Sequence, residues 1–86
     1  MMAKKDYTIQ LESIKTLIEN GKIKKLSQLE KLSPTHISKS IGINYGRYIT
    51  KLHKPELFTL LELKKLSKLV NIELKVLIEI ILKEIR

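Results

Sequence analysis

The chain contains no cysteine, which excludes disulfide bonds and thiolate zinc sites and suits a reducing compartment. Glycine and proline are scarce, at three and two of 86 residues, so few positions can interrupt a regular element. Long apolar runs are missing too, because Glu79 divides 76–78 from 80–82, and neither run could span a bilayer. The first ten residues contain Lys4, Lys5 and Asp6 instead of the apolar stretch of a secretory signal. We therefore expect one soluble, cytoplasmic domain over 1–86, since a chain this short builds a single core.

Residue patterns typical of catalytic, metal-binding or nucleotide-binding sites are also sparse. The two histidines, His36 and His53, do not share a helical face at metal-ligand spacing, and neither belongs to a recognisable triad with a serine and an acid. Gly21, Gly42 and Gly46 are spaced like turns and not like a phosphate-binding loop. We expect no catalytic site, metal or cofactor, and the sequence indicates no small-molecule effector.

Charge is one-sided, because 17 Lys and Arg residues outnumber nine Asp and Glu residues and give a formal net charge of +8. This excess favours a polyanionic partner, either nucleic acid or an acidic membrane surface. The segment from Pro34 to Lys54 contains no acidic residue at all. An uninterrupted positive surface of this kind suits the neutralisation of phosphates.

Leu, Ile, Lys and Glu recur every three or four residues, a period that predicts an all-α fold with five to six helices in a compact bundle. Four helix starts carry N-cap signals, which are Ser27 with Glu30, Ser33 with Pro34, Asn44, and Thr59 with Glu62. The predicted helices cover about Thr8–Asn20, Ser27–Leu32, Pro34–Ile41, Asn44–His53, Thr59–Val70 and Glu73–Ile85. The fifth helix should direct one apolar stripe to the core, made of Leu60, Leu63, Leu66, Leu69 and Val70.

The segment 35–52 reads THISKSIGINYGRYITKL and places two short helices on either side of Gly42, which permits the positive φ of a sharp turn. Ser38 supplies a small residue where the two helices meet, and Ile41 and Ile43 flank the glycine with apolar side chains. The segment resembles the phage-repressor (Cro-like, or XRE) helix-turn-helix family. The resemblance continues through 58–63 to 69–72 and covers about two thirds of the chain. It implies a DNA-binding domain whose helix-turn-helix runs from about Pro34 to Lys54 and whose 44–53 helix reads the major groove.

Two features depart from the family pattern. The family usually has inward aliphatic residues at the sixth and ninth positions after the turn glycine, which here are Tyr48 and Lys51, whereas Ile49 and Leu52 lie one residue later. Either the turn is one residue longer here or the recognition helix is rotated. The additional helix at Ser27–Leu32 also moves the contacts expected from the family's first helix away from the motif.

Residues on the outward face of the 44–53 helix can reach base edges in a major groove. Arg47 is the leading candidate, because a guanidinium can donate two hydrogen bonds to guanine, although a phosphate contact is an equal alternative. The predicted base contacts are Asn44, Tyr45, Gly46, Arg47, Thr50 and Lys51, and the predicted phosphate contacts are Thr35, His36, Lys39 and Lys54. Lys51, with one mobile ammonium, should act mainly on phosphate.

Three residues of this helix have a second interpretation. Tyr45 and Tyr48 are spaced like core or core-edge residues, which competes with base stacking or phosphate binding. Gly46 should cost about 1 kcal/mol relative to alanine inside a helix. Either a partner approaches it closely or packing is relaxed near the helix start.

The last predicted helix has apolar residues around more of its circumference than one docking face needs. We therefore expect a homodimer through Val76, Ile80 and Leu82. The main alternative to DNA binding is a protein-interaction module, such as an antitoxin or adaptor, on the same fold. An adaptor should expose an apolar patch at the 44–53 helix, whereas a DNA reader should gather positive charge there. A membrane-surface role comes third, because Glu73, Glu79 and Glu84 oppose it.

Overall fold

The computed structural model describes residues 7–85 and shows the predicted all-α architecture in that range. The described residues form five α-helices and two short 3-10 helices, named η1 and η2. In chain order they are α1 (Tyr7–Glu19), η1 (Leu26–Lys31), α2 (Pro34–Ile41), α3 (Tyr45–His53), η2 (Pro55–Leu57), α4 (Leu60–Val70) and α5 (Leu74–Ile85). Each predicted helix is present, and the predicted boundaries agree to within about two residues.

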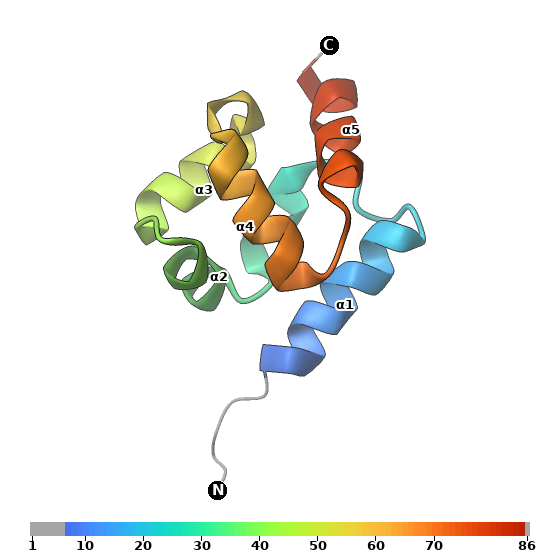
Figure 1. The fold of residues 1–86 in the computed structure, drawn as a ribbon, viewed down its shortest axis with the longest axis horizontal. Helices are drawn as coiled ribbons and strands as arrows, with labels where there is room; N and C mark the ends of the chain where they lie inside the picture. Colours follow the sequence, from blue (N-terminus) through green and yellow to red (C-terminus); the bar gives the residue numbers. More distant parts are fainter. Residues whose placement is uncertain (1–6, 86) are drawn as a thin grey trace, which may run out of the picture.

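The helix α4 holds the bundle together. It packs against α2 on one side and against α1 and α5 on the other, as Figure 1 shows with α4 through the middle of the view. The helix α3 packs against α2, η1 and η2, and therefore lies at the edge of the bundle away from α1. This arrangement leaves one side of α3 open to solvent.

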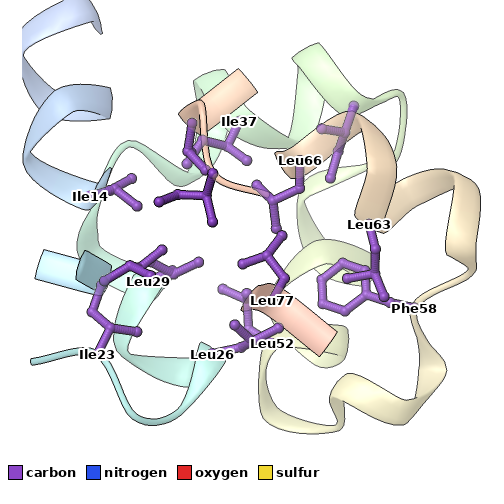
Figure 2. Packing of buried hydrophobic residues seen from close by; sticks show 14 of the residues in the cluster. Ile14, Ile23, Leu26, Leu29, Ile37, Leu52, Phe58, Leu63, Leu66 and Leu77 are labelled. Atoms are coloured by element: carbon purple, nitrogen blue, oxygen red, sulfur yellow. The ribbon is translucent and has the colours of Figure 1, made fainter. Parts of the chain in front are cut away.

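A single cluster of buried side chains unites the five α-helices and η1 (Figure 2). Leu77 of α5 is fully buried and lies near the centre of that view, between Leu66 of α4 and Leu52 of α3. Ile14 reaches the cluster from α1 and Ile37 from α2. Each helix is therefore fixed by apolar burial, which stabilises by roughly 1.5 to 3 kcal/mol for each large side chain.

Two of the predicted N-caps form as expected. The Asn44 side chain accepts a hydrogen bond from the Arg47 amide at 2.8 Å, which starts α3. Thr59 and Glu62 form a capping box at the start of α4, with both side-chain to amide distances at 3.0 Å. Such caps satisfy amides that have no partner within the helix.

The other two N-cap predictions need correction. The Ser27–Glu30 capping box is wrong, because η1 begins at Leu26 with Lys25 at the N-cap position, and Gln28 accepts hydrogen bonds from the Lys24 and Lys25 amides. Ser33 does precede α2, but its backbone is left-handed, with φ of 53°, and its side chain makes no capping hydrogen bond. Glu30 instead meets His53 of α3, a contact between distant residues that the local sequence could not reveal.

The predicted inward stripe of α4 is also wrong at one end. Leu60 is exposed, whereas Leu63, Leu66 and Val70 are buried and Leu69 is partly buried. Leu60 is the first residue of α4 and therefore lies at the end of this apolar face. Leu60 therefore contributes to a surface and not to the core.

Candidate nucleic-acid interface

The turn between α2 and α3 is short and well bonded. Gly42 has φ of 82°, and its amide donates to the carbonyls of Ser38 and Lys39 at 3.0 and 3.2 Å. The Ile43 amide donates to the Ser38 carbonyl at 3.0 Å, and Asn44 then caps α3. Because every residue of the turn has a defined role, α2 and α3 are held as one unit.

The inner face of α3 is anchored by Tyr48 and Leu52, which are both fully buried. The Tyr48 ring meets Phe58 edge-on, with ring centroids 6.5 Å apart. Lys51, in contrast, is only partly buried, and Leu52 beside it fills the core. The large aromatic side chain of Tyr48 and the aliphatic side chain of Leu52 thus anchor α3 to the core.

The outer face of α3 is exposed at five of the six predicted base-contact positions, which are Asn44, Tyr45, Gly46, Arg47 and Thr50. Tyr45 is 51% exposed, so its core alternative is wrong, whereas Tyr48 is a core residue as predicted. At Gly46, an added Cβ would find its nearest neighbour, Asn44 Oδ1, at 3.7 Å, which is ordinary contact. The fold therefore tolerates a side chain at Gly46, and packing within the protein does not explain the glycine.

The Lys51 side chain does not lie where a DNA contact requires it. Its ammonium is not on the open face but 2.7 and 2.9 Å from the two carboxylate oxygens of Glu62 on α4, and the two side chains are 16% and 15% exposed. Burial tends to raise the pKa of Glu62, but hydrogen bonds from Lys51 and Thr59 together with the charge of Lys51 lower it overall. The Glu62 carboxylate is thus held in its charged form.

Exposed cations surround the open side of α3. Lys39 lies in the last turn of α2, Arg47 lies in the first turn of α3, and Lys54 follows α3 directly. Lys65 on α4 adds a cation that sequence reasoning missed, because its ammonium lies 3.9 Å from the Cβ position of Gly42. No local pattern marks Lys65, since only the packing of α4 on α2 brings it to this turn.

Two carboxylates approach α3 from other elements, and each meets a basic side chain of that helix. Glu62 pairs with Lys51, and Glu30 Oε1 lies 2.6 Å from His53 Nε2. Glu30 comes from η1 and is thus used for this contact and not for a cap. Arg47 lies on the exposed face near the start of α3, and the segment from Pro34 to Lys54 contains no acidic residue that could pair with it.

The predicted phosphate contacts at Thr35 and His36 form a separate group. Both lie in the first turn of α2, at the opposite end of that helix from Gly42. Thr35 is exposed and His36 is partly buried, and the Thr35 carbonyl accepts the Ser38 hydroxyl at 3.1 Å. The structure thus offers two clusters, one at the start of α2 and one from the turn along α3.

Within residues 7–85, no three His, Asp or Glu side chains gather as a metal site requires, and no helix there is long and apolar enough to cross a membrane. Searches against models of known families, against curated proteins and against solved structures found no match to this chain.

Proposed function

We propose that this protein binds double-stranded DNA with sequence preference and acts as a small cytoplasmic transcriptional regulator, with α3 in the major groove. One observation supports this most directly. The open side of α3 presents Arg47 together with Asn44 and Thr50, flanked by exposed lysines and without an acidic residue of its own segment. A major groove admits one α-helix, and hydrogen-bonding side chains near the start of that helix reach base edges.

The residues of this surface have distinct roles in the proposal. Arg47 donates to a guanine edge, while Asn44, Tyr45 and Thr50 contact neighbouring bases and Gly46 lets the DNA approach. Lys39, Lys54 and Lys65 neutralise phosphates beside the groove, and Thr35 and His36 contact a more distant phosphate. Lys51 has no direct role, since its ammonium is engaged by Glu62.

The adaptor alternative receives less support at α3. Among the residues whose exposure the structure describes, the large apolar ones that are exposed lie on η2, α4 and α5, and only Tyr45 lies on α3. A partner protein would need an apolar patch at α3 to dock there. The apolar surface on the other elements suits a different interaction, which is compatible with bound DNA.

The test is selection of preferred sites from random duplex DNA, followed by titration at several salt concentrations. We expect affinity to fall steeply with salt, and Arg47→Ala to cost about 1 to 3 kcal/mol on the preferred site while relaxing one base position. Lys75→Ala is the matched control, because it removes one exposed cation on α5 and should leave the preference unchanged. Absence of binding to any duplex at low salt would overturn the proposal.

We also propose that the protein forms a homodimer, but the three residues expected at its interface do not share one face. Val76 and Ile80 are partly buried and line a groove of about 640 Å³ together with Ile18 and Ile23. Leu82 is exposed and lies roughly 200° around α5 from Ile80, given 100° per residue. Only Leu82 therefore belongs to an open apolar face.

Leu82 belongs to what we call the leucine surface, whose members are Leu57, Leu60, Leu61, Leu82 and Ile85. These side chains are between 45 and 68% exposed and come from η2, α4 and α5, and α5 contacts both other elements. They carry no charge, so two copies of a chain with net charge +8 can meet there without opposing their cations. None of these five residues lies on α3, so a dimer formed through them leaves the side chains of α3 available for two DNA half-sites.

Sedimentation measurements at high micromolar concentration test the dimer. We expect Leu82→Glu to give a monomer with unchanged helix content, because a charge enters the interface. Thr16→Glu adds the same charge at an exposed position of α1 and should leave the dimer intact. A wild-type monomer over the whole concentration range would contradict the proposal.

A further inference from the structure

The contact between Lys51 and Glu62 joins α3 to the first turn of α4. Both carboxylate oxygens of Glu62 are within 2.9 Å of the ammonium, and both side chains are mostly shielded from water. This geometry differs from that of an exposed surface ion pair, which contributes little. Breaking a shielded pair leaves a charge without its partner, so the two helices are coupled through it.

Glu62 is also fixed from its own side. Its Oε1 atom accepts a hydrogen bond from the Thr59 amide at 3.0 Å, while Thr59 Oγ1 accepts one from the Glu62 amide at 3.0 Å. The capping box therefore determines where the carboxylate lies, and the carboxylate determines where the Lys51 ammonium lies. The start of α4 serves as a fixed point for α3.

Lys51 follows Arg47 by four residues, so the two side chains lie on the same side of α3, one turn apart. Holding Lys51 against α4 limits rotation of α3 about its own axis. The orientation of Arg47 relative to the bundle is thereby set from outside α3. The negative charge of Glu62 also neutralises the charge of Lys51, one of the two cations on this side of the helix.

We propose that Glu62 is a positioning residue for the DNA-reading surface, which holds Lys51 away from phosphate and orients α3 so that Arg47 reaches a base. This inference rests on the proposed DNA binding. It assigns selectivity to a residue that does not touch DNA. Freed from Glu62, Lys51 would contact phosphate and strengthen binding to every sequence alike.

The test uses Glu62→Gln, Lys51→Met and the double variant, because glutamine can still accept the Thr59 amide and methionine keeps the apolar stem. With Glu62→Gln we expect the salt dependence of binding to random DNA to steepen by about one unit, since one more phosphate is neutralised. The preference for the selected site over random DNA should fall by about tenfold, as when a bidentate base contact is weakened. Lys51→Met and the double variant should keep the wild-type salt dependence.

Three results would overturn this inference in distinguishable ways. A salt dependence that becomes shallower by about one unit in Lys51→Met would show that Lys51 already contacts phosphate in the wild type. An unchanged salt dependence and preference in Glu62→Gln would show that Glu62 does not control α3, while leaving the proposed DNA binding intact. A wild-type protein that binds no duplex DNA would overturn both proposals together. Circular dichroism of each variant checks that the helices are retained.

Discussion

Replacing Gly46 by alanine separates the demands of folding from those of binding. The residue is the second of α3, has no positive φ, and would place its Cβ no closer than 3.7 Å to another atom. Alanine is favoured over glycine in helices by about 0.5 to 1 kcal/mol, with the lower value apt for a first turn. For a domain of this size, we expect the melting temperature to rise by about 2 to 4 °C.

DNA affinity should change in the opposite direction. If DNA approaches α3 at Gly46, the added methyl group occupies space that the DNA needs, and we expect affinity to fall by about tenfold, or 1.4 kcal/mol. Thermal unfolding and fluorescence anisotropy with selected and random duplexes measure the two effects. Thr16→Ala is the control, since it raises helix propensity on the exposed side of α1 and should leave DNA affinity unchanged.

Two outcomes would refute this reasoning about Gly46. An alanine variant that binds DNA as tightly as the wild type would show that the DNA does not approach this residue. A destabilised variant would show that the backbone at Gly46 needs glycine for folding. In either case the glycine would lose its value as a marker of the binding surface.

The remaining predictions concern stability. Tyr48→Phe should raise the free energy of unfolding by about 1 kcal/mol in denaturant titrations, because burial raises the pKa of Tyr48 far above its usual range and the protonated hydroxyl has no partner among the described residues. Ser33→Gly should also stabilise, by roughly 1 kcal/mol, since φ is 53° there, whereas Asn71→Gly at φ of 60° should gain less because asparagine tolerates this conformation. The folded-state pKa of Glu62 lies below its ordinary value of 4.5, so its ionised form stabilises the folded state. This contribution is complete well above pH 4.5 and is lost as the pH falls through the folded-state pKa. Lys51→Met should flatten this acid dependence of the free energy of unfolding.

The sequence predicted the helices well because their end signals are local. Asn44 caps α3 by bonding to an amide three residues later, and Gly42 ends α2 through its own backbone freedom. The Thr59–Glu62 capping box is local in the same way. These three signals depend on residues a few positions apart, so pattern and chemistry found them, although the caps predicted at Ser27 and Ser33 by the same reasoning did not form.

Contacts between distant residues could not be predicted in this way. Lys51 and Glu62 are 11 positions apart, and Glu30 and His53 are 23 apart, and no periodic pattern links either pair. The helical spacing of Lys51 placed it beside Arg47, but it could not show that a carboxylate from α4 would reach it. The predicted DNA contact of Lys51 therefore followed from its helical position alone. It could not include Glu62, which engages the ammonium in the structure.

The same limit applies to apolar residues, and it bears on function. Leu60 and Leu63 are both part of one helical stripe, yet Leu63 is buried and Leu60 is exposed, because the neighbouring helices cover only part of α4. Periodicity identifies which residues could be buried, whereas packing decides which ones are. Among the described residues, the exposed leucines lie outside α3, and the exposed face of α3 presents Asn44, Arg47 and Thr50. A protein that uses one helix for DNA and a second surface for its own partner requires this separation, since a dimer contact at α3 would block the groove-facing side chains.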